Sequence, residues 1–317
     1  MNFLHFYIPQ PIFLQLGPIT IHWYGFFMAL AVLAGLLVSL QMAKWHKVDK
    51  EIIYDLFFYI VIAGFIGARI FYVLYNPAYF WQHPLEIFKI WQGGIAIHGA
   101  LVFGILVLLS FSRKRESSEK GMSLKQWDSR LRGNDKKEAF WLLAAIIAPG
   151  LALGQAIGRW GNYFNQELFG LPTSLPWGIP IEFINRPAGF ESFNYFHPAF
   201  LYESVGDIAI FILLLLMHWF FTRKARDEGR GMGDEPKLTS NGYVLRVTCY
   251  VSIVMCYALL YSTLRFGLEF LRIDPTAGNI FGVRATQGLS AMILIISIFY
   301  TIYFYYKKIP YDANDGE

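Results

Sequence analysis

Seven apolar segments, each about 20 residues long, constrain this 317-residue chain more than any other feature. A helix needs roughly 20 apolar residues to cross the hydrocarbon core of a bilayer. The composition agrees, because 55% of the residues are hydrophobic and only 16% are charged, whereas about a quarter are charged in a soluble protein. We therefore predict an all-α integral membrane protein with spans at residues 22–43, 52–75, 94–112, 139–157, 199–221, 243–264 and 285–306.

The distribution of basic residues predicts the orientation of these helices. The connection 113–138 holds nine Lys or Arg, and the connection 222–241 is also rich in them, whereas the alternate connections hold few. By the positive-inside rule, the rich loops are cytoplasmic, the N-terminus is outside and the C-terminus is inside. The long polar connection 158–198 then forms a periplasmic loop or small cap. Residues 1–20 contain no Lys or Arg, so we expect a retained interfacial segment and not a cleaved signal peptide.

Several function classes lack their usual sequence features. The formal net charge of +4 is too small to indicate nucleic-acid binding. No zinc-type His/Cys cluster, H-E-x-x-H, G-x-S-x-G or P-loop motif is present, which argues against metalloprotease, serine-hydrolase and nucleotide-driven mechanisms. The two cysteines, Cys249 and Cys256, fall within one apolar segment and are interpreted as small buried residues.

Polar residues gather at the predicted outer ends of the helices. A single arginine near a helix end is most often an anchor that reaches the interface. Several converging helices instead favour one shared, outward-facing polar site. Arginine binds phosphate through its planar fork, so the expected ligand is an anionic phospholipid headgroup. The residues concerned include Tyr24, Arg69, His98, Arg159, Asn162, Asn165, Glu167, His197, Glu203, Asp207, Arg265, Glu269 and Arg272.

Glycines on the fourth predicted helix have two interpretations. Gly150, Gly154 and Gly158 are spaced four apart on one face, and Gly161 follows. Small residues at this spacing are typical of close helix packing. The bare backbone at Gly158 and Gly161 would also let a headgroup approach the neighbouring Arg159, and both interpretations can hold.

Two further patterns also leave alternatives open. Arg265 and Glu269 are four residues apart, so they form either a simple intrahelical ion pair or a pair in which Glu269 orients Arg265 toward an external anion. His98 is flanked by Gly93, Gly94 and Gly99, which would keep space around it. It is either an interfacial hydrogen-bonding residue or a general base.

Six ordered motifs resemble the prolipoprotein diacylglyceryl transferase family. The most specific is GRWGNYFNQELFG at 158–170. The others, in chain order, are WYG at 23–25, GARIFYVLYN at 67–76, GGIAIHGAL at 93–101, HPAFLYE at 197–203 and RFGLEFLR at 265–272. One departure is Ala100, which stands where the family commonly has a second glycine after the histidine.

The resemblance implies a reaction and a setting. The family transfers the diacylglyceryl group from phosphatidylglycerol to the lipobox cysteine thiol of a prolipoprotein, forming a thioether and releasing glycerol phosphate. This is the first step of bacterial lipoprotein maturation, in the inner membrane with the site near the outer leaflet. No metal or other cofactor is implied, and the partners are phosphatidylglycerol, prolipoprotein signal peptides and the membrane.

The resemblance also assigns roles to individual residues. His98 would be the general base, although the arginines could instead lower the thiol pKa directly. Arg159 and Arg265 would hold the phosphate. The remaining residues would bind or shape the substrate site, with Glu167 and Glu269 orienting the arginines and Arg69 and His197 as weaker candidates; the substrate-binding set is Tyr24, Arg69, Gly158, Gly161, Asn162, Asn165, Glu167 and Glu269.

Two rival functions predict different patterns. A lipid transporter or flippase would place polar groups through the whole membrane depth, whereas this sequence concentrates them at one end. A lipid-binding scaffold would bind the headgroup without modifying a thiol.

Overall fold

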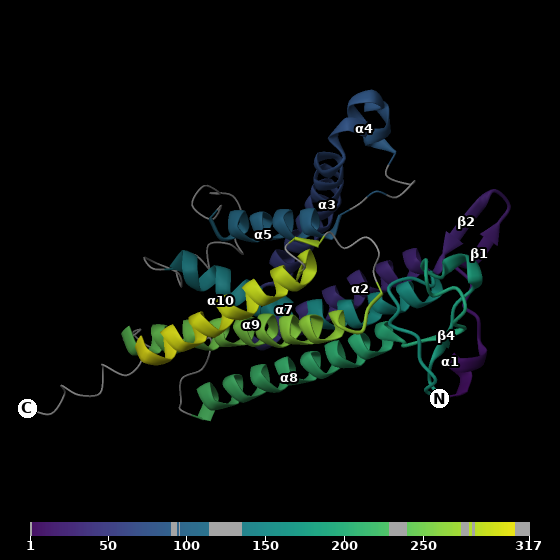
Figure 1. The fold of residues 1–317 in the computed structure, drawn as a ribbon. Coiled ribbons are helices and arrows are strands. Elements are labelled where there is room, and N and C mark those ends of the chain that lie inside the picture. Colours follow the sequence, from purple (N-terminus) through teal and green to yellow (C-terminus); the bar gives the residue numbers. More distant parts are fainter. Residues whose placement is uncertain are drawn as a thin grey trace, which may run out of the picture.

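Seven long helices dominate the computed structural model, which describes residues 2–89, 94, 96–113, 135–227, 240–273, 279–280 and 283–307. Each of them coincides with one of the segments predicted from the sequence (Figure 1). The helices are α2 (Trp23–Trp45), α3 (Lys50–Tyr75), α5 (Ile97–Arg113), α7 (Asp135–Phe164), α8 (Ala199–Asp227), α9 (Ser240–Glu269) and α10 (Ala285–Lys307).

Five helices among the described residues are long and apolar enough to cross a membrane, namely α2, α3, α7, α8 and α9. The apolar stretches in α5 and α10, Gly99–Ser112 and Ser290–Tyr303, are shorter among the residues searched. Large apolar side chains on the long helices face outward. On α3, for example, Phe58, Phe65 and Ile66 are 61%, 57% and 52% exposed. Contiguous exposed apolar surface of this extent is typical of contact with lipid. The mainly helical fold is consistent with the predicted membrane class, whereas the count of seven spans, their orientation and the periplasmic location of the cap stay predictions.

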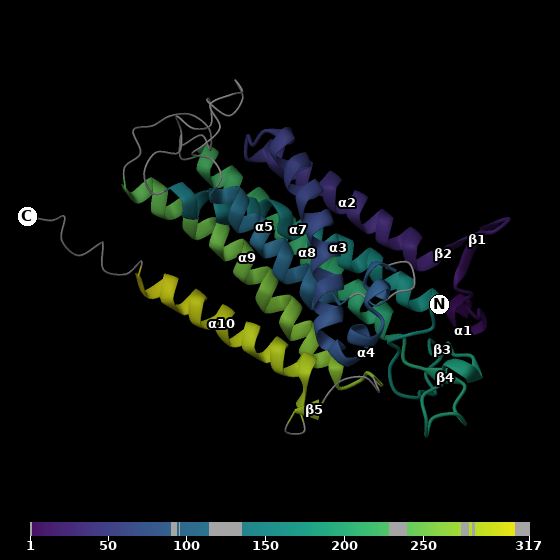
Figure 2. The same ribbon diagram turned by 90° about the horizontal axis from the view of Figure 1, so that it is seen from above.

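Helix α7 lies at the centre of the assembly and packs against α2, α8 and α9. Helix α3 packs along α5, and α10 packs along α9 (Figure 2). In Figure 1, α3 rises out of the layer of the other helices and carries the short helices α4 (Pro77–Gln82) and η1 (Pro84–Phe88) beyond its end. The main apolar core lies where α2, α3, α7, α8 and α9 meet, with Ile53, Leu56, Ile146 and Leu214 completely buried.

The glycines of α7 make close contact with α2. A Cβ atom added at Gly150 would lie 2.5 Å from the carbonyl oxygen of Gly35, and one at Gly154 would lie 3.2 Å from that of Ala31. One added at Gly161 would lie 3.0 Å from the ring of Tyr24. The packing interpretation of the glycine spacing is therefore confirmed at Gly150 and Gly154. A Cβ atom added at Gly158 would meet nothing closer than Met28 Sδ at 4.0 Å, and the substrate-binding role of Gly158 and Gly161 stays a prediction.

Helix α7 extends further than predicted. The polar residues 158–164 were expected to begin the outer loop, but they form the last two turns of the helix. The helix ends in a Schellman motif, because Glu167 N donates to Asn162 O at 3.0 Å and Gln166 N donates to Tyr163 O at 3.0 Å. Gln166 holds the left-handed position, with φ of 50°, that glycine usually takes. Its buried side chain donates to Pro9 O and accepts from Glu182 N, at 2.8 and 2.7 Å, which holds this conformation.

The segment after α7 folds into a small cap with its own apolar core. Strand β3 (Ile179–Pro180) pairs with β4 (Tyr195–Phe196), and a turn of 3₁₀ helix, η4 (Phe183–Asn185), lies between them. The N-terminal segment joins this cap, because α1 (Asn2–Phe6) packs against β3 and the hairpin of β1 (Ile12–Leu16) and β2 (Ile19–His22) leads into α2 (Figure 1). A short pair, β5 (Asn279–Ile280) and β6 (Val283–Arg284), precedes α10. The all-α prediction thus omitted three small sheets.

A proline inside α7 is compensated by a histidine of α8. Pro149 lacks a backbone N–H, which leaves the carbonyl of Ala145 without its helical partner. His218 Nε2 donates to this carbonyl at 3.0 Å, and His46 Nε2 lies 2.8 Å from His218 Nδ1. Because a carbonyl only accepts, His218 carries its proton on Nε2 and accepts from His46.

The predicted cytoplasmic loops lie mainly in 114–134 and 228–239, outside the described residues.

Candidate functional site

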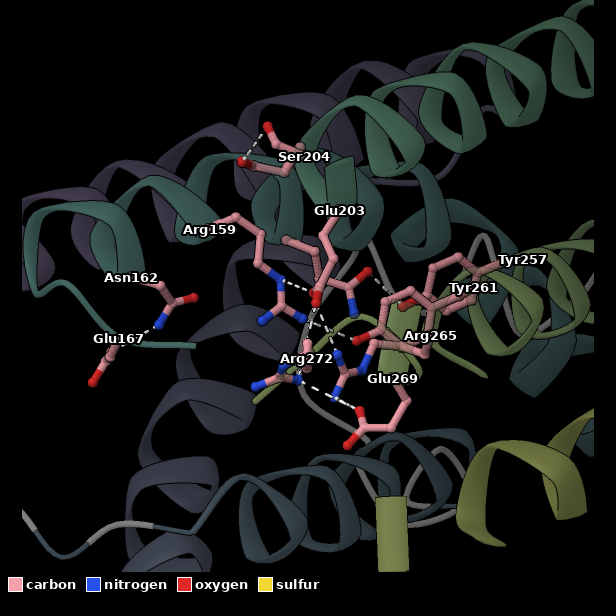
Figure 3. Close-up of polar contacts among 12 residues, drawn as sticks. Arg159, Asn162, Glu167, Glu203, Ser204, Tyr257, Tyr261, Arg265, Glu269 and Arg272 are labelled. Carbon is pink, nitrogen blue, oxygen red and sulfur yellow. Dashed lines mark hydrogen bonds and ion pairs between the residues drawn. The ribbon is translucent and has the colours of Figure 1, made fainter. Parts of the chain in front are cut away.

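Charged side chains from three helices meet beside the cap (Figure 3). Arg159 lies near the end of α7, Glu203 lies in the first turns of α8, and Arg265 and Glu269 lie at the end of α9. Arg272 follows in the turn after α9. We call these five residues the arginine cluster.

Glu203 is the centre of the arginine cluster. Its carboxylate lies 2.5 Å from Arg159 Nε, 2.8 Å from Arg265 Nη1 and 3.9 Å from Arg272 Nη1. The side chain is only 3% exposed. The negative charge of Glu203 holds together three arginines whose positive charges would otherwise repel one another. Removing one partner of such a buried ion pair is strongly destabilising. Sequence reasoning had placed Glu203 near the outer end but had given it no role.

Glu269 joins two of the same arginines. Its carboxylate lies 3.2 Å from Arg265 Nη2 and 3.7 Å from Arg272 Nη1. The contact with Arg265 is the i, i+4 pair expected from spacing, and the contact with Arg272 extends it. Burial lowers the pKa of Arg272, and the neighbouring charge of Arg265 acts in the same direction.

The cap fixes the position of Arg272. Gly170 and Arg272 form an antiparallel bridge. Next to them, Leu171 N donates to Leu271 O at 2.7 Å. The polar motif 158–170 therefore contributes Arg159 at one end and a backbone support for Arg272 at the other.

A layer of polar groups continues from the arginine cluster along α9. Arg159 Nη2 donates to the hydroxyl of Tyr261 at 3.5 Å. Tyr257 stacks on Tyr261 with 5.9 Å between ring centroids, and its hydroxyl donates to Gln155 Oε1 at 2.9 Å. These tyrosines belong to an apolar run and sequence reasoning missed them; the four-residue spacing of the two hydroxyls was the only available signal.

Asn162 and Glu167 contact each other. Asn162 Nδ2 donates to Glu167 Oε1 at 2.8 Å, and the Asn162 side chain is buried. We expected Glu167 to orient an arginine. Among the described residues, its carboxylate accepts a hydrogen bond from this amide. Asn165 lies in the turn that ends α7, where its backbone N donates to Gly161 O at 3.1 Å. Figure 3 shows Asn162 and Glu167 beside the arginine cluster, and Tyr24 of α2 lies against Gly161 of α7.

Arg69 lies outside the arginine cluster. Its Nε, Nη1 and Nη2 donate to the carbonyls of Ile87, Gly94 and Glu86, at 2.9, 2.8 and 2.5 Å. A guanidinium held by three carbonyls joins α3 to the segment before α5, so it serves the structure in this position. The expected part of Arg69 in substrate binding stays a prediction.

His98 lies in the first turn of α5, and its side chain is outside the described residues. We expected the three flanking glycines to keep space open around His98, and this expectation is wrong for two of them. A Cβ atom at Gly99 would lie 2.0 Å from Gly67 O, and one at Gly94 would lie 2.6 Å from Arg69 Nη1. These glycines allow α3 to approach closely. Gly93 is outside the described residues. His197 is close to the hydroxyl of Tyr202, with 3.2 Å between Nδ1 and the oxygen.

The arginine cluster is suited to binding an anion. Three guanidinium groups from three chain segments converge, and the side chains of Arg159 and Arg265 remain 18% and 13% exposed. Their planar forks match a phosphate or carboxylate. No group of three or more His, Cys, Asp or Glu residues able to hold a metal is found within the part of the chain that the structure describes.

Comparison with known proteins gives the family of this chain. A model of the prolipoprotein diacylglyceryl transferase family matches residues 11–233. The phosphatidylglycerol–prolipoprotein diacylglyceryl transferase of Trichormus variabilis is 38% identical over 302 residues, which cover 95% of this chain and 92% of the relative. Its namesakes from Prochlorococcus marinus and Synechocystis are 37% and 34% identical, and cover 97% of this chain and 95% and 94% of their own lengths.

The chain belongs to the prolipoprotein diacylglyceryl transferase family. This match confirms the resemblance drawn from the six motifs and makes the chain a transferase. Within this family member, the motifs at 158–170, 197–203 and 265–272 supply all five residues of the arginine cluster. The motif at 67–76 supplies Arg69 and Gly67, which fix the start of α5.

Proposed function

We propose that this chain transfers the diacylglyceryl group from phosphatidylglycerol to the lipobox cysteine thiol of prolipoproteins. The observation that carries the proposal is the convergence of Arg159, Arg265 and Arg272 on Glu203 in a member of this family. The names of the relatives specify phosphatidylglycerol and prolipoproteins, and the guanidinium forks of paired arginines suit the phosphate of such a lipid.

In the proposed reaction, the thiol sulfur attacks the carbon of the diacylglyceryl group that is bonded to the phosphate oxygen. A C–S bond forms, the C–O bond to phosphate breaks, and glycerol phosphate leaves with the electron pair. The thiol proton passes to His98 as general base, or it passes to solvent when the thiol ionises under the influence of the arginines. Arg159 and Arg265 stabilise the charge that develops on the leaving phosphate. The nucleophile comes from the substrate, so Cys249 and Cys256 have no part.

The proposed setting is the bacterial inner membrane. Seven spans, an outer N-terminus and an inner C-terminus place the arginine cluster and the cap near the outer leaflet. The exposed apolar surface of α2, α3 and α8 and the alternation of basic loops support this arrangement.

A direct test uses a lipobox peptide incubated with purified protein and phosphatidylglycerol in detergent. Mass spectrometry should find a gain of one diacylglyceryl group on the cysteine. The control reaction contains phosphatidylcholine, whose headgroup has no net charge, and should give little product. Lipid binding or transport without any mass gain would favour the scaffold or flippase and contradict the proposal.

A further inference from the structure

Asp207 is a buried carboxylate that the proposed reaction does not use. It lies on α8 one turn after Glu203, and its side chain is completely buried. Neither carboxylate oxygen has a hydrogen-bond partner among the described residues. A buried acceptor without a donor is costly and is retained where it has a task.

Charged and titratable groups from every helix packed against this part of α8 interact with Asp207. Glu203 shares its helix face, because residues four apart on a helix are neighbours. The groups from the other helices are Arg159 on α7 and Tyr257, Tyr261 and Arg265 on α9. Arg272 and Glu269 complete the arginine cluster beyond them.

The charges of these groups balance when the site holds no substrate. Arg159, Arg265 and Arg272 carry three positive charges, and Glu203, Glu269 and Asp207 carry three negative charges when all are ionised. This balance counts the arginine cluster and Asp207 alone; Glu167, paired with Asn162, lies beside this group and is not included. Adding a phosphodiester with its single negative charge leaves an excess of one negative charge in a poorly solvated site, which is unfavourable.

One carboxylate can remove this excess by taking up a proton. Glu203 and Glu269 are stabilised as anions by arginine contacts at 2.5–3.9 Å. Within the described part of the chain, the Asp207 carboxylate accepts no hydrogen bond, so protonating it breaks none. We propose that Asp207 takes up one proton from the solvent when an anionic phospholipid binds, so that the net charge of the site stays unchanged. The proposal rests on the proposed function, which puts the lipid phosphate at the arginine cluster.

The inference is tested by counting protons during lipid binding. The full-length protein in detergent is titrated calorimetrically with short-chain phosphatidylglycerol, in two buffers with different ionisation enthalpies at the same pH. The wild type should take up close to one proton per lipid. Its affinity for the lipid should fall by about tenfold for each unit by which the pH rises, over the pH range in which binding takes up the proton. Asp207→Asn should bind with nearly no proton uptake and with an affinity that changes little with pH. The control variant Asp55→Asn changes a carboxylate at the end of α3 that lies far from the arginine cluster. Its proton uptake and its affinity should equal those of the wild type.

The possible results separate the two proposals. Binding without proton uptake by the wild type overturns the inference but leaves the proposed function standing. An Asp207→Asn protein that takes up as many protons as the wild type also overturns it. Failure of phosphatidylglycerol to bind the folded wild type contradicts the proposed function, and with it the inference. If Asp207→Asn does not fold, the proton count of the wild type decides alone.

Discussion

At the level of single residues, the shape of the guanidinium group matters as much as its charge. Arg159 uses Nε toward Glu203 and Nη2 toward Tyr261, so one planar group makes two separate contacts. A lysine at this position supplies one compact charge and cannot make both. The geometry therefore predicts that charge alone is insufficient here.

Arg159→Lys should lower transferase activity by about 10²–10³-fold, as is typical when one transition-state donor is lost. The rate is measured with the lipobox peptide assay, and folding is checked by thermal unfolding in detergent. Arg223→Lys, at the opposite end of α8, is the matched control and should retain most activity. Full activity of Arg159→Lys would argue against bidentate phosphate binding.

Glu203 should matter more for stability than any other carboxylate of the site. Glu203→Gln removes the shared partner of three arginines, and breaking a buried ion pair costs about 3–5 kcal/mol. Glu269→Gln removes the partner of two and should cost less. The comparison uses unfolding midpoints in detergent, and equal midpoints for the two variants would show that Glu203 is not the centre of the cluster.

At the level of elements, glycine contacts determine how close the helices approach. Gly99 on α5 touches the backbone of α3, and a side chain there would overlap Gly67 O. Backbone cannot move aside as a flexible side chain can, so the start of α5, which carries His98, depends on this contact.

Gly99→Ala should therefore destabilise the protein by about 1–3 kcal/mol and reduce transfer. Gly104→Ala is a control on the same helix, because its new Cβ atom would meet nothing closer than Ile60 Cγ2 at 3.9 Å. Thermal unfolding and the peptide assay measure both effects. Equal behaviour of the two variants would mean that α3 and α5 adjust freely.

The histidine pair at the far end of the helices predicts a dependence of stability on pH. Burial, with a further effect of the neighbouring His218, lowers the pKa of His46 from 6.5 to about 3. The folded state therefore binds the proton more weakly than the unfolded state. The contribution to stability is complete above about pH 6.5 and is lost as the pH falls toward 3, by up to about 1.4 kcal/mol per pH unit.

Unfolding midpoints measured between pH 7 and pH 4 should fall for the wild type. His46→Gln should be less stable at pH 7 but should lose less on acidification, because it has no imidazole to protonate. Parallel pH profiles for the two proteins would show that His46 does not carry this dependence.

At the level of the whole molecule, the proposed orientation places the cap and the basic loop 113–138 on opposite sides of the membrane. With Cys249 and Cys256 replaced by alanine, Ser192→Cys in the cap should react with a membrane-impermeant maleimide on intact spheroplasts. Ser118→Cys in the basic loop should react only after the membrane is permeabilised. Reversed labelling would overturn the orientation derived from the basic loops.

The helices and the family motifs were predictable because both are local properties of the chain. Hydropathy located all seven long helices, and the motif 158–170 alone pointed to the family. Local patterns failed at helix ends, since the polar residues 158–164 looked like a loop but continue α7 until the Schellman motif at Gln166. There the buried contacts of Gln166 with Pro9 and Glu182 decide, and these come from distant segments.

The sequence by itself indicated apolar helices suited to a membrane and arginines gathered near one end of them, because burying charge in lipid is costly wherever it occurs. Only the tertiary structure decided which carboxylate each arginine meets. Glu203 became the centre because α7, α8 and α9 bring their ends together, whereas Arg69 on α3 donates to three carbonyls of η1 and of the segment before α5. Spacing along one helix cannot reveal partners on another, since those contacts depend on how the helices pack.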